Sequence, residues 1–384
     1  MNLKRIITFA FVFAIVALTV GLSGCEKIAP MVPDDTTTMP ETMDREVPIG
    51  LVVSLTGKDA EPYGLPMQRG FELAREEINA LGHGNLMFVP ADDQSSEDGA
   101  IAAVQQLVDL GVPAIVGIAI SDYLEDAFPI AQENGVVAFS SVSTAAGLSS
   151  IGDFVFRTGL AVDIANSNGV MITHEKLGYE KVALIYDAAD AYSTSSNEEI
   201  VKALEAGGVE ILAQETFQTG DTDFTAQLTN IMSMGPDALF ISALSVEMTQ
   251  LVIQAGDLGI QLIVPDLTAK EIQDAGDAAE GAIAFTGWTS LSNIPGNQVF
   301  IQKYRAKYGI EPEPWAAQSY ATLYILANAI AHAQSANSTA IRDALAQTMD
   351  FPTILGNFSF DPNGEAVYDP IVLMVKDGEL QLFE

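Results

Sequence analysis

Hydroxyl side chains follow two short apolar runs in the first half of the chain. Ser121 comes after Ala114–Ile118, and four hydroxyl residues come after Val136–Phe139, namely Ser140, Ser141, Ser143 and Thr144. Runs of this length indicate buried parallel strands. In an open α/β sheet, ligands bind beyond the carboxyl ends of the strands, where helix N-termini present free N–H groups. The spacing therefore indicates one wall of a pocket for a small polar or anionic group, with ordinary N-capping as the alternative.

Other residues offer the complementary chemistry. Asp266 lies at the end of a later predicted strand, and Tyr63 and Tyr192 offer flat walls with polar tips. A free amino acid needs N–H and hydroxyl donors for its carboxylate, and acceptors that include a carboxylate for its ammonium group. Ser121 and Thr144 can donate hydrogen bonds to the carboxylate, and Asp266 can accept them from the ammonium group. These residue types therefore fit a zwitterion.

Catalytic and metal-binding motifs are absent from the sequence. The histidines His83, His174 and His332 lie far apart, and the lone cysteine, Cys25, permits neither a Cys-x-x-Cys motif nor an intramolecular disulfide. There is no Gly-x-Ser-x-Gly elbow, P-loop or Gly-x-Gly-x-x-Gly fingerprint. Because no acid–base pair or partnered nucleophile is visible, we predict a protein that is not an enzyme and needs no cofactor or metal.

Length and charge narrow the class of protein further. The chain has 384 residues with 48% apolar content, which suits two domains after removal of a leader. Its 17 basic and 51 acidic residues give a net charge of −34. Nucleic acid is therefore not an expected partner, because phosphate binding needs a basic face. The acidity fits either general solubility or adaptation to high salt.

The N-terminus carries an export signal. Two basic residues precede the apolar run Ile6–Val20, and Leu-Ser-Gly-Cys ends at Cys25. This ending resembles the lipobox of bacterial lipoproteins, which implies a signal peptide over residues 1–24 and a lipid on Cys25; an unlipidated secreted protein is the alternative. Residues 25–46 are rich in Pro, Thr and acids, which predicts a disordered tether with a reach of roughly 25 Å.

The folded body shows two successive series of alternating strands and helices. The first starts at the strand Ile49–Leu55 and the second near Phe154. Two βαβ series predict an α/β fold of two lobes with a cleft between them, the usual place for a small ligand. The tail adds a long helix over Trp315–Gln334, and Asp377-Gly378 between apolar runs predicts a hairpin.

An ordered set of short motifs resembles the periplasmic leucine/isoleucine/valine-binding family, the type I solute-binding proteins of ABC importers. The match spans roughly residues 47–384. It comprises Ser-Leu-Thr-Gly at 54–57 with Tyr-Gly at 63–64, the helix over Gly70–Asn79, Asp-Asp-Gln at 92–94, Ile-Val-Gly at 115–117, Phe-Arg-Thr at 156–158, Tyr-Asp at 186–187, Ala-Ala-Glu-Gly at 278–281 and Phe-Asp-Pro-Asn-Gly at 360–364.

The resemblance implies two Rossmann-like lobes with parallel sheets, joined by three hinge crossovers. We place the crossovers near Leu160, Leu291 and Phe351. Lobe 1 would then comprise residues 47–160 and 291–350, and lobe 2 residues 161–290 and 351–384.

The resemblance also implies roles for individual residues. Ser121 would hold the ligand carboxylate, Tyr192 would close over the ligand and Asp266 would take the ammonium group. The loop after the fourth strand would contact both charged groups through Ser141, Ser143 and Thr144.

One departure concerns the side-chain end of the site. The family has a second aromatic residue near Leu244-Ser245, and this sequence has none. Trp288 is a candidate wall, with hinge packing as the alternative. Arg157 of the Phe-Arg-Thr motif is expected to brace the hinge, with direct ligand contact as the alternative.

Together these features predict the substrate-binding component of an ABC importer. It would be exported, lipid-anchored through Cys25 and facing the periplasm or exterior, and would bind a branched-chain or other aliphatic amino acid with hinge closure. Its expected partners are an inner-membrane permease and the membrane, and it would be monomeric. The alternatives are a lipid-anchored ligand sensor, or a binder of an amide, urea or small organic acid.

Overall fold

The computed structural model describes residues 46–82 and 85–383. The predicted signal peptide, the lipidation site Cys25 and the tether apart from Glu46 lie outside these residues. Within the described part of the chain, no helix combines the length and the apolar character needed to cross a membrane.

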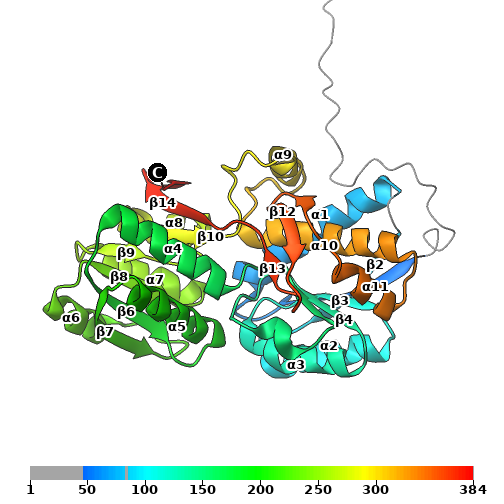
Figure 1. Cartoon of the computed structure of the whole chain (residues 1–384), viewed down its shortest axis with the longest axis horizontal. Helices are drawn as coiled ribbons and strands as arrows, with labels where there is room; N and C mark the ends of the chain where they lie inside the picture. Colours follow the sequence, from blue (N-terminus) through cyan, green and yellow to red (C-terminus); the bar gives the residue numbers. More distant parts are fainter. Residues whose placement is uncertain (1–45, 83–84, 384) are drawn as a thin grey trace, which may run out of the picture.

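A five-stranded parallel sheet forms the centre of the first lobe (Figure 1). Its spatial order is β2 (Leu86–Asp92), β1 (Val47–Val53), β3 (Ala114–Gly117), β4 (Val137–Ser140) and β5 (Val155–Arg157). The predicted neighbours β3 and β4 pair in parallel, with Val116 opposite Phe139. Their carboxyl ends therefore meet at one edge, as the sequence predicts.

A seven-stranded mixed sheet forms the centre of the second lobe. Its order is β15 (Glu379–Leu382), β14 (Ile371–Lys376), β10 (Ile283–Thr286), β9 (Gln261–Ile263), β8 (Ala238–Ser242), β6 (Lys181–Asp187) and β7 (Glu210–Phe217). Strands β6 to β10 run parallel, and β14 and β15 form the predicted hairpin, with Asp377 and Gly378 both at positive φ in the turn.

Helices accompany both sheets, as the alternating pattern predicts. Those of the first lobe are α1 (Leu65–Ala80), α2 (Glu97–Asp109), α3 (Ser121–Glu133), α9 (Asn297–Tyr308), α10 (Pro314–Ala333) and α11 (Ser338–Leu345). Those of the second lobe are α4 (Val162–Leu177), α5 (Ala191–Ala206), α6 (Thr225–Met234), α7 (Ser245–Gly256) and α8 (Ala269–Ala275). This arrangement confirms the predicted α/β fold.

The buried apolar residues divide the chain into two bodies. One continuous core runs from Val47 to Leu160 and from Trp288 to Tyr368, and we call these segments lobe 1. The remaining described residues, 161–287 and 369–383, form lobe 2, whose core lies on the two faces of the larger sheet. The chain thus changes lobe near residues 160, 287 and 369.

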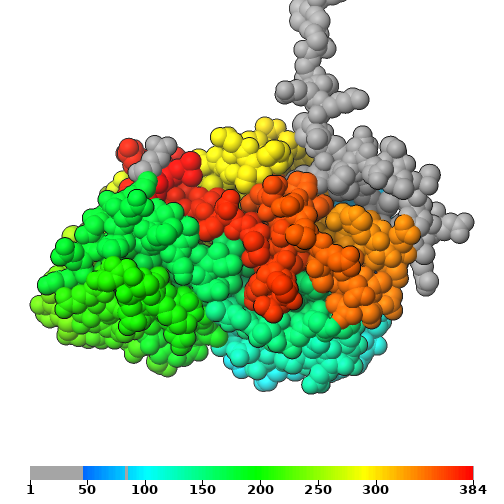
Figure 2. Space-filling view, viewed as in Figure 1, coloured from blue at the N-terminus to red at the C-terminus, as the bar shows by residue number. Residues whose placement is uncertain are grey.

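The third crossover corrects the predicted boundary. Residues 351–368 carry the small antiparallel sheet of β11 (Phe351–Thr353), β12 (Gly356–Phe360) and β13 (Ala366–Val367). This sheet packs on lobe 1, because the Phe360 ring lies 5.6 Å from that of Phe139 and 5.0 Å from that of Phe156. In Figure 2 the orange-red surface of this segment lies on lobe 1, and the red surface of the residues that follow leads toward lobe 2. Alternating apolar residues predict the strands but not which lobe they join.

Close packing of α1 against α10 gives a test of the lobe 1 core. A Cβ atom on Gly70 would lie 2.1 Å from the carbonyl oxygen of Ala316. We expect Gly70→Ala to lower the free energy of unfolding by about 1–3 kcal/mol, because the two helix backbones must separate.

The comparison variant is Ala80→Gly at the exposed end of the same helix, which should cost less than about 1 kcal/mol. Urea unfolding followed by circular dichroism measures both changes. Equal midpoints for Gly70→Ala and the wild type would contradict this account of the helix contact.

Candidate functional site

A small pocket lies in the cleft between the two lobes. Its cavity volume is about 40 Å³, room for roughly three waters. Lobe 1 contributes Tyr63, Ala119, Ile120, Ser121, Val142, Thr144 and Trp315. Lobe 2 contributes Tyr192, Ala243, Leu244, Ser245, Met248, Pro265, Asp266 and Glu271. Five of the residues singled out in the sequence therefore line one pocket: Tyr63, Ser121, Thr144, Tyr192 and Asp266.

An unusual backbone conformation at the end of β3 shapes the lobe 1 wall. Ile118 has φ +55°, which a β-branched residue rarely adopts. Its N–H donates to Val52 at 2.9 Å, and its carbonyl accepts from the hydroxyls of Ser140 and Ser143 at 2.9 and 3.2 Å. These bonds hold the turn after which residues 119–121 line the pocket.

Ser121 begins helix α3, so its hydroxyl lies beside the helix N-terminus. The first N–H groups of a helix have no carbonyl partner within it and favour negative charge. The Ser121 hydroxyl accepts from the N–H of Ala145 at 3.4 Å, which leaves its own proton free to donate. The hydroxyls of Ser121 and Thr144 and the first N–H groups of α3 therefore form a cluster of hydrogen-bond donors on the lobe 1 wall.

The other two serines of the loop after β4 do not line the pocket. The Ser141 hydroxyl lies 2.9 Å from that of Ser319 on α10, and the Ser143 hydroxyl donates to Ala119 at 2.9 Å. Both side chains are buried and fasten the loop to lobe 1. The expectation that their side chains reach a ligand is corrected accordingly, while Thr144 of the same loop lines the pocket.

Carboxyl groups characterise the lobe 2 wall. Asp266 follows β9 with φ +62°, which aspartate tolerates, and its N–H donates to Phe285 at 3.0 Å. The Tyr192 hydroxyl donates to the Asp266 carboxylate at 3.2 Å. Glu271 lies in the first turn of α8, where it forms a capping box with Thr268.

The protein leaves these two carboxyls without a cation. Among the ion pairs of the described residues, none includes Asp266 or Glu271. Burial raises the pKa of Asp266 to about 7; the bond from Tyr192 opposes this shift and the charge of Glu271 adds to it. Burial likewise raises the pKa of Glu271. A cation in the pocket would favour the ionised form of both carboxyls and so lower their pKa values.

Hydrogen bonds across the cleft show that the lobes are closed. The N–H of Ser245 donates to the Tyr63 hydroxyl at 3.0 Å, and that of Ala191 donates to the Asp122 carboxylate at 3.0 Å. The N–H of Ala146 donates to the Ser195 hydroxyl at 2.9 Å. Each bond joins one lobe to the other beside the pocket, so the structure shows the arrangement in which the pocket is enclosed.

Trp288 has the contacts of a packing residue. Its indole N–H donates to Asn297 at 2.8 Å, and its ring lies edge-on to Phe300 with centroids 6.0 Å apart. It is buried in the lobe 1 core next to the second crossover and does not line the pocket. Of the two roles considered for it, the structure supports hinge packing. The aromatic wall is instead formed by Tyr63 and Trp315, with ring centroids 5.9 Å apart.

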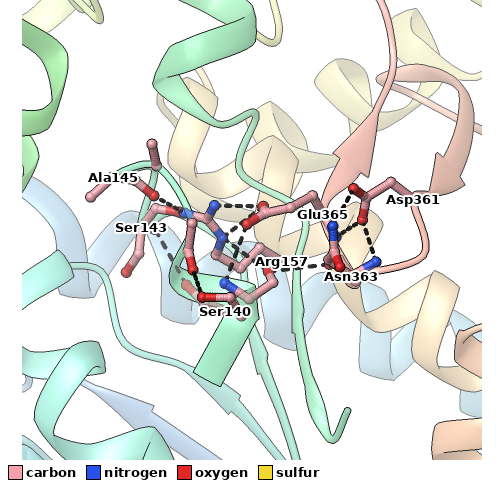
Figure 3. A network of polar contacts seen from close by, with 12 residues as sticks. Ser140, Ser143, Ala145, Arg157, Asp361, Asn363 and Glu365 are labelled. Atoms are coloured by element: carbon pink, nitrogen blue, oxygen red, sulfur yellow. Dashed lines mark hydrogen bonds and ion pairs between the residues drawn. The ribbon is translucent and has the colours of Figure 1, made fainter. Parts of the chain in front are cut away.

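Arg157 ties three segments of lobe 1 together (Figure 3). Its guanidinium pairs with Glu365 at 2.5 Å and donates to the carbonyls of Ser143 and Ala145 at 3.2 and 2.6 Å. Its side chain is wholly buried, and it holds the loop that carries Thr144 against the turn before β13. Its contacts are those of a brace and not of a ligand-binding residue.

Glu271, Trp315 and Met248 are among the pocket residues that were not anticipated from the sequence. Glu271 lies in a Thr-x-x-Glu capping pattern that starts two residues after Asp266, and this pattern is a usable signal. Trp315 follows Pro312 and Pro314 at the start of the longest helix, where the composition predicts only a helix start. Met248 lies on the apolar face of α7 and carries no signal that separates it from core residues.

The Arg157–Glu365 pair gives a second test. We expect Glu365→Gln to lower the free energy of unfolding by about 3–5 kcal/mol, because the buried guanidinium loses its counter-charge. The control is Asp153→Asn, which removes the exposed partner of Arg342 and should change stability by less than about 1 kcal/mol. Urea unfolding midpoints measure both, and a small effect of Glu365→Gln would contradict the bracing role.

Comparison with known proteins shows that the chain is similar to solute-binding proteins. The family model "Periplasmic binding protein" matches residues 46–379. The leucine-, isoleucine-, valine-, threonine- and alanine-binding protein of Pseudomonas aeruginosa is 28% identical over 331 residues, covering 83% of this chain and 87% of that protein. A Leu/Ile/Val-binding protein homolog of Brucella suis is 27% identical, with the same coverage of both chains.

Solved structures are similar over nearly their whole length. A leucine-binding protein LivK from Thermotoga maritima has a TM-score of 0.82 at 27% identity and covers 88% of this chain and 98% of its own. The branched-chain amino-acid transporter substrate-binding protein LivJ from Streptococcus pneumoniae, in complex with isoleucine, has a TM-score of 0.81 at 29% identity and the same coverage.

Proposed function

The chain belongs to the periplasmic binding protein family, and we propose that this extracytoplasmic solute-binding component of an ABC transporter captures a small zwitterionic amino acid between its lobes. The single observation that carries the proposal is that the two walls of the pocket present complementary chemical groups. Hydrogen-bond donors face it from lobe 1 and buried carboxyls without a cation face it from lobe 2. A zwitterion is the solute whose two charges match both walls.

The ligand carboxylate binds at the N-terminus of α3. There it accepts hydrogen bonds from Ser121, Thr144 and the unpaired N–H groups of the first turn. The ammonium group binds Asp266, whose other contact is the Tyr192 hydroxyl. Because Asp266 already has a buried and ordered position, it needs no rearrangement to accept the cation.

The remaining wall is apolar and fits an aliphatic side chain. Tyr63, Leu244, Met248 and Trp315 provide this surface. Leucine, isoleucine, valine and alanine, four of the five amino acids named for the Pseudomonas aeruginosa relative, have aliphatic side chains; the fifth is threonine. We therefore propose a branched-chain or other aliphatic amino acid as the first ligands to test.

Ligand binding stabilises the closed arrangement, because its two charged groups contact different lobes. Only contacts that exist in the closed form and not in the open form can shift the equilibrium between them. The permease of the transporter would recognise this closed form. We further propose that the protein acts as a monomer, held at the membrane by a lipid on Cys25.

Substitution of the two charge-binding residues tests the assignment. We expect Ser121→Ala and Asp266→Asn each to weaken binding of the preferred amino acid by about 1–3 kcal/mol, because each removes a hydrogen bond to a charged group. Isothermal titration calorimetry measures the affinities, and Ser141→Ala, outside the pocket, is the control. Unchanged affinity in both site variants, or binding confined to acids that lack an ammonium group, would contradict the proposal.

The pH dependence of binding gives an independent test. The empty protein holds Asp266 with a pKa of about 7, well above its unfolded value, so this carboxyl favours folding at low pH and that contribution is lost as pH rises through 7. An ammonium ligand needs the ionised form. We therefore expect affinity to fall by up to about tenfold per pH unit below 7, with proton release on binding.

Calorimetry in buffers of different ionisation enthalpy counts the released protons at pH 6. Asp190 and Glu313 also have pKa values raised by burial to about 7, so the decisive comparison is with Asp266→Asn. This variant should lose most of the proton release. Equal proton release in the variant and the wild type would exclude Asp266 as the ammonium site.

A further inference from the structure

Two carboxyl groups from different lobes meet at the first turn of helix α5. Asp190 of lobe 2 caps this helix, and its Oδ2 atom accepts from the N–H of Ser193 at 2.7 Å and from the Ser193 hydroxyl at 2.6 Å. Asp122 lies in the first turn of α3 in lobe 1 and accepts from the N–H of Ala191, the residue after Asp190, at 3.0 Å. The start of one helix therefore binds a carboxyl from each side of the cleft.

The other oxygen of Asp190 is buried without a partner. Asp190 is only 4% exposed, and no hydrogen bond of the described structure reaches its Oδ1 atom. Asp122 lies within hydrogen-bonding reach of this carboxyl, since its own carboxylate already contacts the N–H of the next residue. A charged oxygen that has lost its water and gained no donor is costly. One proton shared by the two carboxyls would supply the missing hydrogen bond.

No cation offsets the two carboxylates. Among the ion pairs of the described residues, none includes Asp122 or Asp190. Tyr63 of lobe 1 and Tyr192 on α5 also face Asp190, but burial raises the pKa of both hydroxyls well above their usual value, so they stay neutral. Asp187, at the end of β6, has both oxygens in hydrogen bonds within lobe 2.

The elements packed along α5 present neutral partners to it. They are Asn166 of α4, Gln214 of β7 and Ser242 of β8. The hydrogen bonds that cross the cleft at Tyr63 and Ser195 likewise have acceptors that stay neutral near pH 7. Of the three cleft-crossing bonds described above, the one at Asp122 is therefore the one that responds to pH in this range.

Closing of the lobes and protonation of this pair are linked. In the closed structure burial raises the pKa of Asp190 to about 7, and the charge of Asp122 adds to the shift. An aspartate exposed in an open cleft has a pKa of about 3.9. A group whose pKa is higher in the closed form takes up a proton on closing. The closed form is therefore stabilised as pH falls below about 7, and this stabilisation is lost as pH rises through 7.

From this geometry we propose that Asp122 and Asp190 form a proton-dependent latch between the lobes. On closing, the pair takes one proton from solvent and shares it in an O–H···O hydrogen bond across the cleft. Loss of the proton leaves two like charges that push the lobes apart. A hydrogen bond between a carboxylic acid and a carboxylate is charge-assisted and stronger than a neutral one. Neither residue lines the ligand pocket, so the latch controls how readily the empty protein closes.

Single-molecule Förster energy transfer between dyes on the two lobes measures the closing constant of the ligand-free protein from pH 5.5 to pH 8.5. The dyes are attached through Gln106→Cys in lobe 1 and Glu205→Cys in lobe 2, both at exposed positions, in a full chain that carries Cys25→Ser. Without ligand, the ammonium-binding role proposed for Asp266 has no part in the result.

Asp190→Asn imitates the protonated latch, because its amide oxygen can keep the cap bond and its N–H can donate to Asp122 at every pH. We expect the ratio of its closing constant to that of the wild type to rise about 30-fold from pH 5.5 to pH 8.5, since only the wild type loses the cross-cleft bond above about pH 7. Asp266 and Glu313 titrate in both proteins, so their effects cancel in this ratio.

Two further variants locate the effect. Asp122→Asn leaves the cap of α5 unchanged and should show the same rise, so the test does not depend on the folding of Asp190→Asn. Glu125→Gln removes an exposed carboxyl of α3 and should give a constant ratio. A ratio that stays constant in Asp122→Asn and Asp190→Asn, or that rises as much in Glu125→Gln, would overturn the latch and leave the proposed ligand site intact.

Discussion

Carboxyl groups of the two lobes act on each other at two places in the closed cleft, and this repulsion is a constraint on closure. Burial raises the pKa of Asp190 of lobe 2, and the charge of Asp122 of lobe 1 adds to this shift; one oxygen of Asp190 has no hydrogen-bond partner in the described structure. Glu313 and Glu271 repeat this opposition beside the pocket. Desolvation and like charge both oppose closure of the empty protein, so a ligand that supplies a positive charge, as proposed above, would shift the equilibrium toward the closed form.

The donors and acceptors of the site depend on backbone held in unusual conformations. Ile118 and Asp266 both have positive φ at the ends of strands, one on each side of the cleft. The lobe 1 turn is held by Ser140 and Ser143, and the loop that follows it is held by Arg157, so buried side chains outside the pocket determine where the pocket residues lie. The rigidity of each wall therefore originates outside the pocket, in the side chains that hold these turns.

The sequence predicts the strands and which strand ends meet, because apolar runs and their order determine neighbours in a parallel sheet. It does not predict where a loop directs each hydroxyl: Thr144 reaches the pocket, whereas Ser141 and Ser143 bind backbone and α10. Trp315 comes to the site from more than 170 residues beyond Thr144, and no local pattern reports such an approach. Which lobe β12 joins is likewise decided by packing against residues far away in the sequence, and local patterns do not predict it.

Three crossings of the chain between the lobes have a consequence for biosynthesis. The small sheet at residues 351–368 completes lobe 1, and the hairpin of β14 and β15 completes the sheet of lobe 2. Both segments come after the other elements of their lobes in the chain, so neither lobe can complete its native core before residues 351–383 have been synthesised. Until then, apolar surface of both lobes stays exposed to aggregation.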